Sequence, residues 1–259
     1  SGTRSIDFTD VKDSYACSSY PDIDVTNGFD AGYNNCWSFG AFNLELLHYR
    51  WRFDNGGESG ATAASSAEDV PLGGNTVYVG DRRRLRIQMK NIGTGTGSDI
   101  AYRLEYAPGA CSAWTPVANN NAASTEAWTM DISPYVKNGV ATTKNSDLST
   151  PAGTFVSGYL MTSTATTPAH TLTTAPQYTE LEYSIRSRAS VAPDTNYCFR
   201  VTNAGAFTNF TYTQSPQITV RPNSARGLDG GSGVEADGGG VPVGGGTPPG
   251  GSGSEPDGG

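Results

Sequence analysis

Apolar and polar side chains alternate in steps of two residues along most of the chain between residues 46 and 221. In RRRLRIQMKN at 82–91, Leu85, Ile87 and Met89 share one face of an extended strand, and the charged side chains share the other. The same pattern continues in DIAYRLEY (Ile100, Tyr102, Leu104 and Tyr106), YTELEYSIRSR (Leu181, Tyr183 and Ile185) and NYCFRVTNAG (Tyr197, Phe199 and Val201), and YTQSPQITV ends the set. Half-buried strands of this kind predict an all-β fold, in which two antiparallel sheets pack face to face as a sandwich.

The first two of these strands are separated by the glycine-rich stretch NIGTGTGS. Glycine adopts positive φ angles without steric cost, and tight hairpin turns need such angles. The stretch therefore predicts a hairpin that pairs the strand at 82–91 with the strand that follows it.

Composition divides the chain into three zones, 1–45, 46–221 and 222–259. The first is acidic and then aromatic, and is predicted to be an N-terminal arm. The second is the predicted sandwich. The third is a Gly/Pro-rich tail with too little apolar surface to offset the entropy of ordering it, so by itself it is predicted to be a flexible linker.

Two stretches near the N-terminus are candidates for contact with another copy of the chain, although core packing is the default interpretation of the second. SIDFTDV alternates apolar and polar residues and is able to add as a strand to an exposed sheet edge. WSFGAFNLELLHYRWRF carries apolar residues at both parities from Trp37 to Leu47, so it must be covered on two sides, by its own sandwich or by a neighbouring subunit. The candidate interface residues are Ile6, Phe8, Val11, Trp37, Phe39 and Phe42.

The four cysteines indicate disulfides, because only two histidines accompany them and a Cys/His zinc cluster is poorly supported. Three pairings are possible, and the one we favour joins Cys17 to Cys36 and Cys111 to Cys198. In NYCFRVTNAG the alternation turns Cys198 away from the apolar face, so the second bridge is predicted to lie outside the sandwich core. Disulfides imply an oxidising, extracellular compartment.

Charge and sequence pattern exclude several classes of function. The formal net charge of −8 gives no basic footprint for nucleic acid, and no stretch is long and apolar enough for a membrane-spanning helix. His48 and His170 lack a recognisable partner motif, so we predict that the chain is not an enzyme and needs no cofactor. Ser1 is expected to follow a removed signal peptide or to lie within a longer gene product.

Calcium is the one metal for which the sequence offers candidate ligands. DIDVTNGFD places Asp22, Asp24, Asn27 and Asp30 at spacings that resemble a calcium loop, and hard cations prefer such oxygen ligands. The sixth position lacks the glycine of an EF-hand. An Asx-rich turn inside the Cys17–Cys36 loop is therefore the favoured interpretation.

Arg82, Arg83, Arg84 and Arg86 form a basic cluster at the start of the strand predicted at 82–91. It is able to bind an acidic glycan or an acidic neighbouring subunit. The favoured alternative is a solvated strand face with cross-strand partners such as Glu105, Glu180 or Glu182.

Several segments resemble known families. APDTNYCFRVTNAG resembles the E–F corner and F strand of a fibronectin type III domain, with Tyr197 at the tyrosine corner, and VGDRRRLRIQMKNIGTGTGSDIAYRLEY resembles the early hairpin of bacterial immunoglobulin-like adhesion repeats. Together with YRWRFDNGGESGATAASSAEDVPL at 49–72, they resemble a repeat module of large secreted bacterial surface proteins. The resemblance implies an immunoglobulin-like or fibronectin type III-like sandwich on a cell surface.

The function expected from these features is structural: a secreted subunit that repeats in an extracellular filament or surface layer, with its arm or tail lying along the next copy. The alternative is a carbohydrate-binding or adhesive module, which would use exposed aromatic side chains such as Trp114 and Trp128 to stack on surface glycans.

Overall fold

The computed structural model describes residues 5–7, 10–11, 23–26, 29–30, 37–73, 76–121, 124–173 and 176–225, and before residue 40 it describes the backbone only. These residues form an all-β protein with several sheets, and their one helical turn is the 3-10 helix η1 (Asn223–Ala225). No helix among them is long and apolar enough to cross a membrane.

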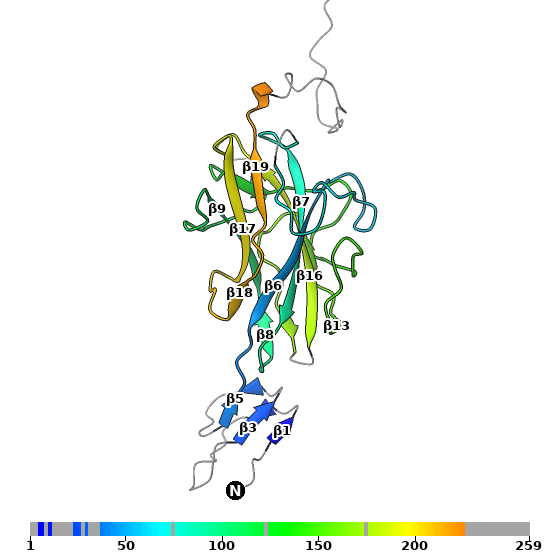
Figure 1. Cartoon of the computed structure of the whole chain (residues 1–259), viewed down its shortest axis with the longest axis vertical. Coiled ribbons are helices and arrows are strands. Elements are labelled where there is room, and N and C mark those ends of the chain that lie inside the picture. The colour runs from blue at the N-terminus through cyan, green and yellow to red at the C-terminus, as the bar shows by residue number, and fades with distance from the viewer. Residues whose placement is uncertain are drawn as a thin grey trace, which may run out of the picture.

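Two larger sheets make up most of the molecule (Figure 1). The eight-stranded sheet has the order β12-β14-β16-β7-β6-β18, with β11 and β13 also pairing with β16. Its strands are β6 (Leu44–Arg52), β7 (Arg82–Asn91), β11 (Trp128–Met130), β12 (Val140–Ala141), β13 (Thr154–Phe155), β14 (Tyr159–Met161), β16 (Gln177–Ser187) and β18 (Phe210–Tyr212). The four-stranded sheet has the order β10-β9-β17-β19, from β9 (Tyr102–Pro108), β10 (Thr115–Pro116), β17 (Thr195–Asn203) and β19 (Gln217–Val220).

One hydrophobic core lies between these sheets. Its residues include every inward-facing position predicted from the alternation, namely Leu85, Ile87, Met89, Ile100, Tyr102, Leu104, Tyr106, Leu181, Tyr183, Ile185, Tyr197, Phe199 and Val201. Trp51 of β6 and Phe199 of β17 meet edge to face with ring centroids 5.5 Å apart, so the two sheets contact each other directly. The period of two was enough to predict the buried face because each strand has one side on this core.

A β-bulge in β6 explains why apolar residues occupy both parities there. The register of β6 on β7 shifts between Leu46 and His48. Before the bulge Leu44 and Leu46 face the core, and after it Tyr49 and Trp51 do. An extra residue in one strand changes which parity points inward. Of the stretch predicted to be covered, Leu44 and Leu46 are therefore covered by the core of the chain's own sandwich.

The predicted hairpin after β7 is wrong. β7 pairs with β6 and β16, while β9 pairs with β10 and β17 in the other sheet. The intervening β8 (Gly97–Ile100) pairs with β15 (His170–Leu172). The glycines serve close packing instead of a turn, because a Cβ atom on Gly95 would lie 1.5 Å from the carbonyl oxygen of Gly40.

The described residues of the arm form five short strands: β1 (Ser5–Asp7), β2 (Asp10–Val11), β3 (Ile23–Thr26), β4 (Phe29–Asp30) and β5 (Trp37–Phe39). β3 pairs in parallel with both β1 and β5, and β2 pairs in parallel with β4. Both the β1–β3 and the β2–β4 pairs join residues 19 positions apart, since Ser5 aligns with Asp24 and Asp10 with Phe29. The described arm strands therefore stack in parallel with one another, and β1 and β2 each have a described partner on one side.

Candidate functional site

Five charged side chains, Arg52, Arg84, Arg86, Glu180 and Glu182, form what we name the charged layer. They lie on β6, β7 and β16, on the face of the eight-stranded sheet that points away from the core. Each of them is at most 1% exposed. Charges buried this deeply are stable only when they are paired and hydrogen-bonded.

Glu182 is the centre of the charged layer. Its Oε2 atom accepts hydrogen bonds from Arg52 Nη1 and Arg86 Nη1, both at 2.8 Å, and its Oε1 atom lies 3.0 Å from Arg84 Nη1. Arg86 Nε also donates to Glu180 Oε2 at 2.7 Å. Burial by itself lowers the pKa of Arg86, but the carboxylates of Glu182 and Glu180 raise it overall, so this guanidinium stays charged. For Arg84 the burial effect prevails and its pKa is lowered.

Two segments, 53–72 and 131–158, cover the charged layer and accept further hydrogen bonds from its arginines. The Gly56 carbonyl accepts from Arg84 Nη2 at 2.7 Å, and the Ala61 carbonyl accepts from Arg52 Nη2 at 2.8 Å. From the other segment, the Thr143 carbonyl accepts from Arg86. The prediction of a solvated arginine face is therefore wrong for Arg84 and Arg86, although Glu180 and Glu182 are their partners. Their burial also removes them as a docking site for an acidic glycan.

Glu105, the third predicted partner, lies on the other sheet. It contacts Arg103 and Arg200 at 2.7 and 2.8 Å. The guanidinium of Arg200 also lies over the rings of Trp114 and Phe207, 4.3 and 5.1 Å from their centroids. This aromatic surface is therefore already occupied by the chain's own arginine.

His48, Glu68 and Asp69 form a second polar cluster at the edge of the charged layer. His48 Nδ1 lies 2.6 Å from Asp69 Oδ2 and 4.0 Å from Glu68 Oε2. The side chains are 29%, 19% and 28% exposed for His48, Asp69 and Glu68, so the cluster is accessible to solvent. Although partial burial raises the pKa of Glu68, hydrogen bonds from Ser149 and the charges of His48 and Arg50 lower it overall.

The nitrogen and oxygen atoms of this cluster all lie within 4.8 Å of one another, which is a spacing that a metal ion can bridge. Sequence reasoning missed it because 20 and 21 positions separate His48 from its two partners and no motif connects them. The β-bulge beside His48 and the covering segment bring the three side chains together.

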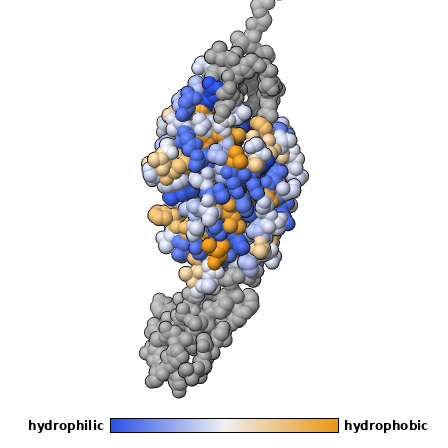
Figure 2. Space-filling model, viewed as in Figure 1, coloured by the Kyte–Doolittle hydropathy of each residue, from blue (hydrophilic) through white to orange (hydrophobic). Residues whose placement is uncertain are grey.

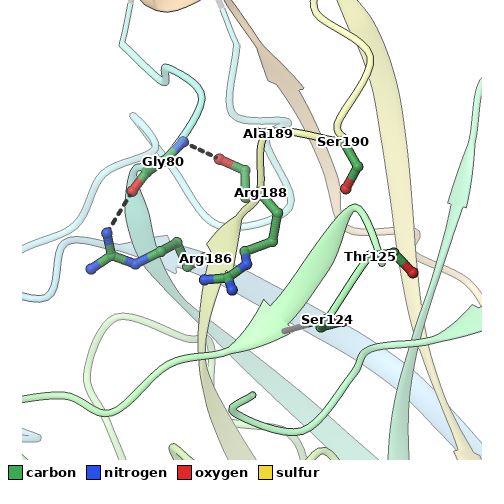
Figure 3. Close-up of a pocket in the computed structure, with 8 residues that line it drawn as sticks. Gly80, Ser124, Thr125, Arg186, Arg188, Ala189 and Ser190 are labelled. Carbon is green, nitrogen blue, oxygen red and sulfur yellow. Dashed lines mark hydrogen bonds between the residues drawn. The ribbon is translucent and has the colours of Figure 1, made fainter. Parts of the chain in front are cut away.

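A pocket of about 510 Å³ lies where β16 ends, and it is lined by Gly80, Ser124, Thr125, Arg186, Ser187, Arg188, Ala189 and Ser190. Figure 3 shows Arg186 reaching toward Gly80, whose carbonyl accepts from Arg186 Nη1 at 3.0 Å. Arg186 Nε donates to Asp131 Oδ2 at 2.7 Å. The lining combines two arginines with four hydroxyl side chains, and Arg186 is already paired with Asp131. Guanidinium and hydroxyl groups are donors of the kind that bind anionic groups.

The disulfide between Cys111 and Cys198 is present, with Cα atoms 5.5 Å apart, and it is the pairing that the sequence predicted. Cys198 alternates with the core residues of β17 and so points away from the core, as expected. It is nevertheless fully buried. Cys17 and Cys36 lie outside the described residues.

Most of the other predicted site residues lie in the arm, where the structure describes the backbone of some residues and leaves others out. Among the interface candidates, Phe8 lies outside the described residues, and Ile6, Val11, Trp37 and Phe39 fall in arm strands described by backbone alone. Phe42 packs against the core of its own chain. Among the calcium candidates, Asp22 and Asn27 lie outside the described residues, whereas Asp24 and Asp30 fall in β3 and β4.

The stacking platform proposed for glycans is wrong for one of its two residues. Trp128 is fully buried in the core, where it meets Phe199 edge to face at 5.2 Å. Trp114 is half-buried beneath Arg200. Apolar side chains at positions without clear alternation, such as Trp128, are assigned to core or surface only by the tertiary structure.

No family model, curated protein or solved structure matches this chain. The structure by itself defines the class as an all-β protein with a disulfide bond.

Stability is expected to fall as the pH drops below about 6.5, because His170 is only 7% exposed and burial lowers its pKa. Below that pH His170 of the unfolded chain takes up a proton, whereas His170 of the folded chain does so only at lower pH. The loss of stability therefore begins near the pKa of the unfolded state and ends near the pKa of the folded state. Within that window it amounts to about 1.4 kcal/mol per pH unit. Urea unfolding at pH 7.5 and 5.5 measures it.

The His170→Gln variant should lose this component of the pH dependence, whereas His48→Gln should retain it. Equal slopes for the wild type and His170→Gln would contradict the assignment.

Proposed function

We propose that this chain is a secreted structural protein, the repeating subunit of an extracellular filament or surface layer, whose copies join head to tail. The observation that supports it best is that the chain enters the sandwich at one end and leaves it at the opposite end (Figure 1). β6 begins at the end next to β5, and the chain leaves the far end after β19, where Arg221 forms a bridge with Tyr78. A heterologous contact between opposite ends repeats without closing and gives a filament.

The proposal includes an immunoglobulin-like or fibronectin type III-like class for the sandwich. The Ala192 N–H donates to Tyr197 Oη at 2.7 Å, five residues away at the start of β17. A tyrosine that bonds back to the backbone just upstream is the tyrosine corner of such domains. The disulfide suits an oxidising, extracellular location. No catalytic role forms part of the proposal.

The arm supplies one half of the proposed contact. β1 is at the end of the sheet order β1-β3-β5, so its described pairing is on one side only. An edge strand offers a row of backbone donors and acceptors to another chain. In this proposal a strand of the neighbouring copy extends the arm stack at β1.

Charge supports the choice of the opposite end as the other half. Residues 1–39 contain six aspartates against Arg4 and Lys12, which gives a net charge of −4 (2 − 6). The arginine pocket lies at the far end, since Gly80 in its lining follows the Tyr78 bridge to Arg221. An acidic arm facing an arginine pocket would orient successive copies in one direction.

The apolar surface also favours contacts at the ends. Figure 2 shows hydrophobic residues in small separate groups on the face of the sandwich drawn there. The exposed large apolar side chains among the described residues are Ile92, Ile132, Tyr135, Val140 and Phe207. One broad apolar docking face is not visible on the side of the sandwich that Figure 2 shows.

The test is to image the purified chain by electron microscopy, together with a variant lacking residues 1–14 and an Arg188→Glu variant. The full chain is expected to form fibres, the truncated chain to stay monomeric, and Arg188→Glu to need at least about tenfold more protein to assemble, since a reversed charge at a contact costs several kcal/mol. Lys137→Glu changes the net charge equally on an exposed residue and should assemble normally.

Fibres from the truncated chain that equal those of the full chain would exclude the arm contact. A monomeric full chain that binds a polyuronate saturably, with loss of binding in Arg188→Glu, would instead support the alternative function of an adhesive, glycan-binding module that uses the same pocket.

A further inference from the structure

The cluster of His48, Glu68 and Asp69 is able to bind a cation independently of any filament contact. It offers one imidazole nitrogen and two carboxylate oxygens, from β6 and from the covering segment 53–72. We infer that this cluster is a binding site for a divalent transition metal ion of the zinc type, with the fourth position open to water.

The donor set distinguishes between metal classes. Calcium and magnesium prefer sites made entirely of oxygen, whereas an imidazole nitrogen together with carboxylates suits zinc and its neighbours in the first transition row. Three protein ligands and one open position form a known zinc arrangement. This site is distinct from the aspartate-rich stretch at 22–30.

The distances permit coordination with small movements. Ligand atoms about 2.0–2.1 Å from a tetrahedral zinc ion lie roughly 3.3 Å from one another. His48 Nδ1 is now closer than that to Asp69 Oδ2, at 2.6 Å, and farther from Glu68 Oε2, at 4.0 Å. Shifts of about 1 Å bring His48 Nδ1 to this spacing from both carboxylates, and the metal then takes the place of the hydrogen bond between His48 and Asp69.

The carboxylates are held by second contacts that would remain in the metal-bound form. Asp69 Oδ1 accepts the N–H of Tyr49 at 2.9 Å, and Glu68 accepts both the N–H and the hydroxyl of Ser149. Such outer contacts orient metal ligands and limit their freedom. The charge of Arg50 acts against a cation at Glu68, so we expect micromolar rather than nanomolar binding.

Metal binding here would connect three parts of the chain. His48 belongs to β6, Glu68 and Asp69 belong to the segment 53–72, and Ser149 belongs to the segment 131–158. Both segments cover the charged layer, so the bound ion would hold that cover against the sheet.

The experiment uses the full chain without an affinity tag, treated with a chelator and then dialysed. Titration calorimetry with zinc chloride is expected to show one site with micromolar affinity, and zinc should raise the melting temperature. His48→Gln and Asp69→Asn should each weaken binding by about 10-fold or more. His170→Gln, which changes the other histidine of the chain, is the matched control and should bind zinc like the wild type.

Circular dichroism of each variant at 20 °C establishes that it is folded. If either His48→Gln or Asp69→Asn does not fold, the other one carries the test. Unchanged zinc affinity in a folded His48→Gln or Asp69→Asn chain would overturn the inference. Absence of a calorimetric response in the wild type at about 100 μM zinc, or an equal response to calcium, would also overturn it, because the proposed donor set predicts a preference for zinc.

Discussion

Replacing Glu182 by glutamine is expected to lower the free energy of unfolding by about 3–5 kcal/mol. The glutamine keeps the shape of the side chain but removes the negative charge that Arg52, Arg84 and Arg86 share. Water cannot compensate, since Glu182 and its arginine partners are at most 1% exposed. Urea unfolding followed by intrinsic fluorescence measures the loss.

Two comparisons isolate the charge effect. Lys137→Gln changes a charge on an exposed residue of the covering segment 131–158 and should alter stability by no more than about 0.5 kcal/mol. In an Arg84→Gln background, Glu182→Gln should lower the free energy of unfolding by less than in the wild type. One of the arginines that the substitution would leave without its carboxylate is then already absent. Additive losses in the double variant would mean that the charged layer does not act as a coupled unit.

Removal of the Cys111–Cys198 disulfide is expected to cost about 4 kcal/mol. The bridge joins residues 87 positions apart, so it removes a large loop-closure entropy from the unfolded chain. The measurement is guanidinium unfolding of the Cys111→Ala and Cys198→Ala single variants at about pH 5, where the remaining thiol stays protonated and does not exchange.

The two variants also test the cause of the loss. Cys111 is half-buried and Cys198 is fully buried, but both substitutions open the same loop. Similar losses would therefore identify the cross-link as the source of stability. A loss confined to Cys198→Ala would show that packing of that side chain matters instead.

The alternation of apolar residues was sufficient to predict the all-β class and the core faces of the long strands. Leu85, Ile87, Tyr183 and Phe199 occupy the core because a period of two places the apolar residues of each strand on one face of that strand. The orientation of Cys198 followed from the same rule. These features depend on local geometry, which each short stretch of sequence contains.

Strand partners were not determined in this way. The glycines after β7 suggested a hairpin, yet β7 and β9 belong to different sheets. Local sequence specifies whether a turn is permitted, but pairing depends on which distant strands complete the sheet, here β6 and β16 for β7.

Burial on the outer face of the larger sheet was decided only by the tertiary structure. The sequence by itself determined that Arg84, Arg86 and Glu182 point away from the core, and the structure places them on the neighbouring strands β7 and β16. It did not determine whether that face meets water, because the answer depends on the segments 53–72 and 131–158 folding over it. The same folding brings Asp69 to His48 across 21 positions, and no periodicity within a single strand encodes such a contact.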